Sequence, residues 1–252
     1  MTKTLGVIPA RMASSRFPGK PLKNILDIPM LAHCYERALL SGACNKLIIA
    51  TPDKEIIEWS ESQDIPSVLT SHSHQRATER AKEALDILTE KEDSYDLILL
   101  LQGDEPQIFP DDIKNLKDSF AGGEFEVVNL IFQITSDDLE DLNVVKAVTD
   151  NNLNIKFFSR SHVPFNSIKT FRQLGMIGFT NKALQNYTTL QPTELEELES
   201  IDMMRFLEND LSIQGVLSSS PIIGVDNPKD IIKAEKMMLN DKIIHLYKEK
   251  YT

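Results

Sequence analysis

The sequence predicts an α/β protein built around a sheet with parallel strands. Short apolar runs of strand length alternate along the chain with longer stretches whose apolar residues recur at helical spacing. The most apolar run, Leu97–Leu101, is typical of a central strand that is buried on both faces. The length of 252 residues suits one large domain, or one domain with a small appended lobe. This alternation favours parallel strands joined by right-handed crossovers.

The expected elements follow one another in regular order. The first strand runs from Thr4 to Ile8 and stops at Pro9, because proline cannot donate a hydrogen bond to a central ladder. Later strands are expected at Lys46–Ala50, Ser67–Thr70, Asp96–Leu101, Glu126–Gln133, Val144–Asp150, Ile155–Arg160, Gly175–Phe179 and Leu211–Val216. Helices are expected at Pro29–Ser41, after the N-cap residue Asp53, and from the segment Ser71–Arg80 up to Leu88. A further helix is expected from Thr193 to Arg205, with Leu195, Leu198 and Ile201 on one face, and the last helix lies at the C-terminus.

The composition excludes several classes of protein. The net charge of −11 argues against a nucleic-acid surface, so we expect no nucleic-acid partner. Cys34 and Cys44 are the only cysteines, too few for a disulfide framework or a zinc set. The sequence shows no signal-peptide pattern and no apolar run of membrane-spanning length. We therefore expect a cytoplasmic enzyme without a membrane partner.

A cationic loop follows the first strand. Within ten residues it contains Arg11, Arg16 and Lys20, with the small residues Ser14 and Ser15 between them. Open α/β sheets bind ligands at the carboxyl ends of their strands, and arginine and lysine are suited to phosphate oxygens. The loop therefore indicates a polyanion site. The alternative is a solvated surface loop whose cations pair with carboxylates of this acidic chain.

Two further polar segments lie where ligands bind in α/β folds. Asp104 follows the central strand in the sequence Gln-Gly-Asp-Glu-Pro, the usual place of a metal-binding carboxylate, although it could instead cap a turn. Ser71–Arg80 precedes a predicted helix and could contact a base or a phosphate. His72 and His74 within it have no third suitably spaced metal ligand.

These motifs resemble one family of enzymes. The segment Ile-Pro-Ala-Arg-x-x-Ser-Ser-Arg-Phe-Pro-Gly-Lys-Pro-Leu resembles the signature of the sugar-nucleotide pyrophosphorylase superfamily, and within it most closely the 3-deoxy-manno-octulosonate (Kdo) cytidylyltransferases. Gln-Gly-Asp-Glu-Pro, Phe-Phe-Ser-Arg and Gly-Val-Asp-Asn-Pro follow in the family's order. The resemblance implies a nucleotide-diphospho-sugar transferase fold: a Rossmann-like mixed sheet in one domain, residues 1–252. It also implies a small β-rich sugar-binding and dimerisation lobe near residues 125–215.

The resemblance also implies a reaction and its residues. CTP and a 3-deoxy-ulosonic acid, Kdo being favoured, would give a CMP-sugar and diphosphate for lipopolysaccharide or another surface glycan. The implied catalytic residues are Arg11, Arg16, Lys20, Asp104 and Asp226, the two aspartates holding Mg²⁺. Nucleotide binding would involve Ala10, Arg11, Ser14, Ser15, Arg16, Lys20, His74, Thr78 and Arg80, and sugar binding Gln102, Arg160, Gln173, Asp202 and Met203. A homodimer is also implied.

Several positions depart from the family pattern. Arg76 and Ala77 replace Ser-Gly beside the expected base. In the expected sugar site, Gln173, Ile177, Phe179, Asp202 and Met203 replace His, Tyr, Tyr, Glu and Gln. The substrate could therefore be 8-amino-Kdo or a sialic-like acid.

Some of the implied site residues could instead have structural roles. Arg160 could be a structural arginine with a buried partner. Met203 could serve helix packing, since methionine fills irregular gaps. Asp226 could form a turn before a helix. The chain as a whole could then be a non-catalytic nucleotide-binding module on the same fold.

Overall fold

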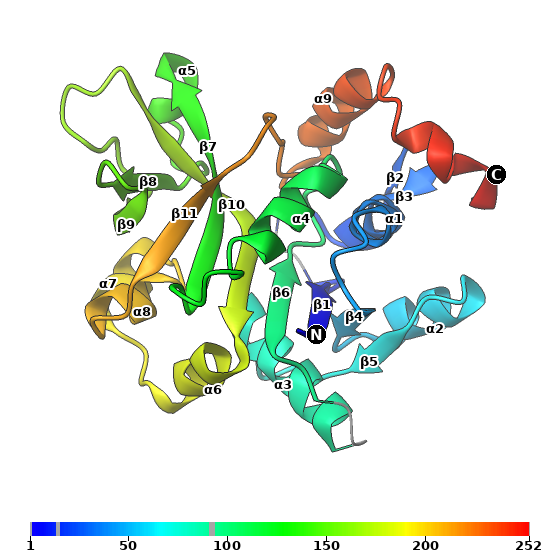
Figure 1. Cartoon of the computed structure of the whole chain (residues 1–252). Helices are drawn as coiled ribbons and strands as arrows, with labels where there is room; N and C mark the ends of the chain where they lie inside the picture. Colours follow the sequence, from blue (N-terminus) through cyan, green and yellow to red (C-terminus); the bar gives the residue numbers. More distant parts are fainter. Residues whose placement is uncertain (1, 14–15, 91–93, 252) are drawn as a thin grey trace. The chain divides into compact units, whose positions relative to one another are not determined.

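The computed structural model describes residues 2–13, 16–90 and 94–251 and contains two compact units. Unit 1 comprises Met1–Lys114 and Ile222–Thr252, and unit 2 comprises Asn115–Pro221 (Figure 1). The β-rich range 125–215 expected from the sequence lies inside unit 2. Among the described residues, no helix is long and apolar enough to cross a membrane.

Unit 1 contains a parallel sheet with the strand order β5-β4-β1-β6. Its strands are β1 (Thr4–Pro9), β4 (Lys46–Thr51), β5 (Ser67–Leu69) and β6 (Leu97–Leu101). The small antiparallel pair β2 (Asn24–Ile25) and β3 (Ile28–Pro29) is separate from it. Every residue of β1 and β6 is buried, as the continuous apolar run at residues 97–101 predicts. The predicted parallel arrangement is thus confirmed for this unit.

Unit 1 also contains helices between its strands and in its C-terminal segment. They are η1 (Lys20–Leu22), α1 (Met30–Leu40), α2 (Lys54–Ser62), α3 (Ala77–Thr89), α9 (Pro228–Met238), η2 (Ile244–Leu246) and η3 (Lys248–Lys250), while the boundary between units falls within α4 (Pro110–Asp118). Asp53 is the N-cap residue of α2, as expected, but its side chain forms no capping bond to the helix. Its Oδ2 instead accepts the Met12 N–H at 2.7 Å. This carboxylate therefore ties down the start of the cationic loop.

The C-terminal segment of unit 1 is joined to α1 by a buried polar chain. Tyr247 Oη lies 2.7 Å from His33 Nδ1 and accepts a bond from Arg37 Nε at 3.2 Å. His33 Nε2 lies 2.8 Å from Ile25 O, which can only accept, so Nε2 carries the proton and Nδ1 accepts from the tyrosine. Arg37 also pairs with Asp241. His33 is fully buried, and this burial lowers its pKa to about 4.

Unit 2 contains a mixed set of strands in the order β10-β7-β11-β9-β8. β10 pairs with β7 antiparallel, β11 pairs with β7 parallel, and β8 and β9 form an antiparallel pair around an Asp-Asn-Asn turn. The bounds are β7 (Val127–Thr135), β8 (Lys146–Thr149), β9 (Asn154–Ser159), β10 (Lys169–Thr180) and β11 (Ile213–Leu217), with α5 (Ser136–Leu139), α6 (Asn181–Thr189), α7 (Glu194–Glu199) and α8 (Met204–Glu208).

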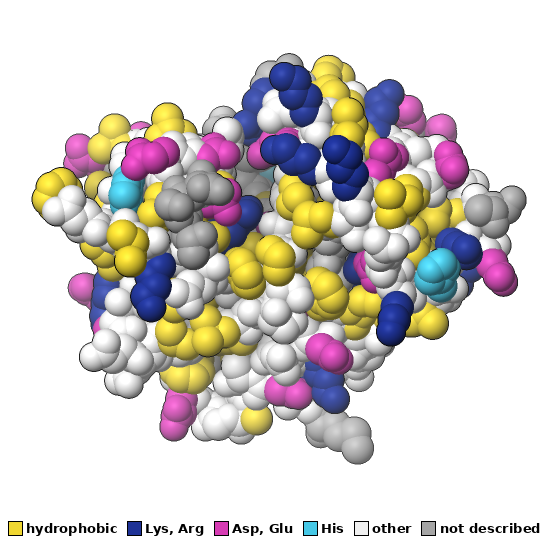
Figure 2. All heavy atoms as spheres, turned by 90° about the horizontal axis from the view of Figure 1, so that it is seen from above, with side chains coloured by type: hydrophobic (Ala, Val, Ile, Leu, Met, Phe, Trp, Pro, Cys, Tyr) yellow, Lys and Arg dark blue, Asp and Glu magenta, His cyan; other side chains and the backbone are white. Residues whose placement is uncertain are grey.

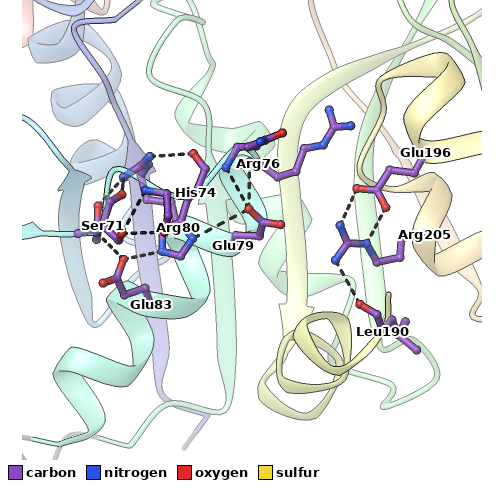
Figure 3. A network of polar contacts seen from close by, with 12 residues as sticks. Ser71, His74, Arg76, Glu79, Arg80, Glu83, Leu190, Glu196 and Arg205 are labelled. Atoms are coloured by element: carbon purple, nitrogen blue, oxygen red, sulfur yellow. Dashed lines mark hydrogen bonds and ion pairs between the residues drawn. The ribbon is translucent and has the colours of Figure 1, made fainter. Parts of the chain in front are cut away.

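The single helix expected from Thr193 to Arg205 is in fact two short helices, α7 and α8. Ser200 between them has a φ of 55°, which ends the first helix. The buried face of α7 presents Glu196, whose carboxylate forms two bonds of 2.6 and 2.7 Å with Arg205 of α8 (Figure 3). Leu198, expected on an apolar face, is 74% exposed. The buried face of α7 therefore carries the Glu196–Arg205 ion pair, where the spacing of apolar residues had predicted an apolar side chain.

The buried histidine predicts a pH-dependent stability. Because its folded pKa of about 4 lies below the ordinary 6.5, His33 contributes stability above pH 6.5 that is lost as the pH falls toward 4. In a His33→Gln variant, the fall in unfolding free energy between pH 7 and pH 4 should be smaller than in wild type by about 3 kcal/mol. Urea titrations at several pH values measure this difference.

The exposed residue His245 provides the matched control. His245→Gln should leave the pH dependence of the unfolding free energy as it is in wild type. Equal pH profiles for His33→Gln and wild type would contradict the assignment of a buried neutral imidazole.

Candidate active site

Unit 1 contains a cavity of about 290 Å³ at the carboxyl ends of β1 and β6. Its lining residues are Pro9, Ala10, Arg11, Ala13, Arg16, Lys20, Pro21, Gln75, Arg76, Ala77, Arg80, Gln102, Gly103, Asp104 and Asp226. Strand ends are the usual ligand-binding edge of an open α/β sheet. Figure 2 views the molecule from above Figure 1 and shows Lys and Arg side chains beside acidic ones on that face.

Four charged side chains meet in this cavity. Lys20 Nζ lies 2.8 Å from Asp104 Oδ2 and 3.5 Å from Asp226 Oδ1, and Arg16 Nη2 lies 3.3 Å from the same Asp226 oxygen. Burial alone would lower the pKa of Lys20, but the two carboxylates outweigh it and raise the pKa. Two of the loop cations, Arg16 and Lys20, therefore pair with carboxylates of this chain, and those carboxylates are the two aspartates of the cavity.

The local backbone directs both aspartates into the cavity. The start of α9 is capped by Asp230, whose Oδ2 accepts the N–H groups of Asp226 and Asn227. The Asp226 carboxylate contacts Lys20 and Arg16. A backbone bond of 2.9 Å from the Val225 N–H to Asp104 O joins the two aspartate segments. Asp104 and Asp226 are thus held side by side by main-chain geometry.

Gly103 lets β6 end close to β1. A Cβ atom at this position would lie 2.9 Å from Pro9 O and 3.3 Å from a methyl group of Leu31. The first contact is with backbone, which cannot swing away. The glycine therefore permits the close approach that places Gln102 and Asp104 at the cavity wall.

The start of α3 forms another wall of the cavity. Arg80 is nearly buried, and its Nη1 donates to Thr70 Oγ1 at 2.5 Å and to Ser71 O at 3.1 Å. Burial and the neighbouring Arg11 lower the pKa of Arg80. His74 Nε2 lies 2.6 Å from Glu83 Oε2 (Figure 3). The histidine is thus part of a local polar network.

Most residues expected at the nucleotide lie together in this cavity. Five of them line it, namely Ala10, Arg11, Arg16, Lys20 and Arg80, whereas His74 and the fully buried Thr78 are not among its lining residues. The expected metal ligands Asp104 and Asp226 and the expected sugar contact Gln102 line it as well. Ser14 and Ser15 lie outside the described residues. Gln75, Arg76 and Ala77 also line the cavity; they lie in the polar segment Ser71–Arg80 that the sequence places beside the expected base.

Arg160, the expected ligand of the sugar carboxylate, is bonded within unit 2. Its Nε donates to Glu199 O at 2.9 Å and its Nη1 to Leu142 O at 3.1 Å. Its backbone N–H donates to the Glu199 carboxylate, which also accepts from Ser159 Oγ. These are the contacts expected of a structural arginine. The guanidinium would have to give up these contacts to bind a carboxylate in a bidentate manner.

The other expected sugar residues are also in unit 2. Gln173 Nε2 donates to Asn129 Oδ1 at 2.7 Å, and the buried Asn129 in turn donates to Leu174 O and Met176 O. This network fills an irregularity of β10 between Gln173 and Ile177. Met203 is fully buried, as a role in helix packing requires. Asp202 is half-buried.

The donor set of the cavity fits Mg²⁺. Among the described residues there is no cluster of three or more His, Cys, Asp or Glu side chains that could hold a metal ion. Mg²⁺ commonly needs only one or two protein carboxylates, because substrate phosphates and water complete its shell. Asp104 and Asp226 already share one cation, the Lys20 ammonium, so their oxygens can converge on a positive charge.

Comparisons with known proteins extend these observations. A family described as cytidylyltransferase matches residues 5–213. The chain is 38% identical over 239 residues to an 8-amino-3,8-dideoxy-manno-octulosonate cytidylyltransferase of Shewanella sp. (strain W3-18-1), with 92% of this chain and 97% of the relative covered. It is 35% identical over 251 residues to a 3-deoxy-manno-octulosonate cytidylyltransferase of Thermodesulfovibrio yellowstonii, with 93% and 98% covered.

A solved structure shares the fold. It is a CMP:2-keto-3-deoxy-manno-octonic acid synthetase complexed with CTP, with a TM-score of 0.87, 28% identity, and 95% of this chain and 100% of that chain covered. The fold and the cavity therefore define an α/β enzyme of the nucleotidyltransferase class, as expected from the sequence. Within that class, the chain belongs to the cytidylyltransferase family.

Proposed function

We propose that the protein transfers the cytidylyl group of CTP to a 3-deoxy-ulosonic acid, Kdo being favoured, and releases diphosphate. The observation that carries this proposal is the cavity in which Lys20 joins Asp104 and Asp226 beside Arg11 and Arg16. The names of relatives that cover nearly the whole chain support the substrate class. The product, a CMP-sugar, would serve lipopolysaccharide or another surface glycan. Because CTP is made in the cytoplasm, we place the enzyme there.

In this proposal, the residues of the cavity position phosphates and neutralise their charge. The anomeric hydroxyl of the sugar acid attacks the α-phosphate in line with the departing diphosphate. Arg11, Arg16 and Lys20 hold the triphosphate, and the small residue Ala10 lies beside them in the cavity wall. Gln102 lies in the cavity wall as the proposed sugar contact. Bound Mg²⁺, held by Asp104 and Asp226, would supply charge neutralisation and a lower pKa for the attacking hydroxyl.

A second sugar acid, 8-amino-Kdo, is supported by a specific observation. Several relatives at 38% identity bear that name. The departures at Gln173, Ile177, Phe179, Asp202 and Met203 also change polar groups of the expected sugar site, and a site that hydrogen-bonds a hydroxyl rejects analogues without it. A sialic-like acid has no such support. A non-catalytic module is disfavoured because the loop cations and both carboxylates are retained in one cavity.

A diphosphate-release assay tests the function and the sugar together. Purified protein with Mg²⁺ should release diphosphate from CTP, and not from ATP, GTP or UTP, when Kdo is present. We expect kcat/KM for Kdo to exceed that for 8-amino-Kdo. If kcat/KM for 8-amino-Kdo exceeded that for Kdo by about 100-fold, which corresponds to about 2.7 kcal/mol, the substrate would be 8-amino-Kdo and the proposed reaction would stand. Absence of diphosphate release with CTP and every sugar acid would reject the function.

We also propose a homodimer formed through unit 2. Its described surface exposes Phe165 (91%), Ile168 (80%) and Leu142 (64%), which are large apolar side chains for a monomer to leave in water. Sedimentation velocity at micromolar concentration should give about twice the chain mass, and Phe165→Asp should shift the protein toward the monomer. A wild-type monomer under these conditions would reject the dimer.

A further inference from the structure

We propose that Arg76 contacts the phosphates of the bound nucleotide and contributes to nucleotide affinity. This inference rests on the proposed function of the same cavity. The family that the sequence resembles has Ser-Gly at positions 76 and 77, so the arginine is a departure from that pattern. In the structure, Arg76 lies in the cavity wall.

The position of Arg76 directs it to the cavity. It is the N-cap residue of α3, in extended backbone (φ −107°, ψ 148°), and the following residue starts a helix of 13 residues. Gln75, Ala77 and Arg80 line the same cavity. Arg76 and Arg80 are four residues apart, one turn of the helix. The N-terminus of α3 adds partial positive charge to that of the two guanidinium groups.

Two acidic groups of the same helix serve other partners. Glu79 Oε2 accepts the backbone N–H groups of Gln75 at 3.1 Å and Arg76 at 3.3 Å, so this carboxylate serves the helix cap. Glu83 pairs with His74. Figure 3 shows the Arg76 side chain extending away from both carboxylates. Arg76 thus lies at the start of α3 among residues that line the cavity.

Most of the charged residues that line the cavity are cations. Five cations line it, namely Arg11, Arg16, Lys20, Arg76 and Arg80, against the two carboxylates Asp104 and Asp226. Lys20 and Arg16 contact those carboxylates. Arg11 and Arg80 are close enough for one to lower the pKa of the other. Such like charges in one cavity are relieved by a polyanion, and the planar guanidinium fork matches phosphate oxygens.

The test compares phosphate binding with base recognition. Isothermal titration of CTP, UTP and inorganic tripolyphosphate is carried out on wild type, Arg76→Gln and Arg76→Lys. Loss of one charge-assisted contact should weaken CTP and tripolyphosphate binding by about 10-fold or more in Arg76→Gln. The ratio of CTP to UTP affinity should stay as in wild type. Arg76→Lys, which keeps the charge and loses the fork, should give intermediate affinities.

Lys23→Gln is the matched control, because it removes one charge from an exposed side chain outside the cavity lining. It should bind all three ligands like wild type. Unchanged tripolyphosphate binding in Arg76→Gln, or a changed CTP to UTP ratio that reveals a base contact, would overturn the inference. If Arg76→Gln does not fold, unchanged affinities in Arg76→Lys would overturn it equally. Failure of the wild type to bind CTP would instead reject the proposed function.

Discussion

The candidate site depends on one ammonium group that two carboxylates share. Lys20 comes from the loop after β1, Asp104 from the end of β6 and Asp226 from the start of α9, so residues separated by 84 and 206 positions meet at one point. Two carboxylates this close repel each other unless a cation lies between them. In the protein without ligand, Lys20 is that cation. When CTP and Mg²⁺ are bound, the same three groups would be redistributed around phosphate and metal.

The surrounding backbone holds this meeting point in place. Gly103 allows β6 to end against β1, the Val225 N–H bonds to Asp104 O, and Asp53 holds the Met12 N–H at the start of the loop. Each contact joins segments that are distant in sequence. The buried polar chain through His33 and Tyr247 fastens the C-terminal segment that follows α9 to α1. The site therefore depends on the whole of unit 1 being folded.

Local sequence patterns predicted much of this arrangement. The strand ending at Pro9, the buried run at residues 97–101 and the polar residues directly after each strand are local signals, and they led to the cationic loop and to Asp104. The bond from Met12 to Asp53 and the inward turn of Glu196 toward Arg205 depend on tertiary contacts. The spacing of apolar residues predicted an apolar face for α7, because such spacing gives no sign that a charged residue such as Glu196 is buried in an ion pair.

The central claim is that Asp104 and Asp226 converge on a single cation position. Its most direct test is thermal unfolding of Lys20→Met with Mg²⁺ alone. With the ammonium removed, Mg²⁺ at roughly 10 mM should occupy the position and raise the unfolding temperature by about 2–4 °C, more than in wild type. Adding Asp104→Asn in the same background should abolish that rise. An unfolding temperature of Lys20→Met that does not respond to Mg²⁺ would contradict the account.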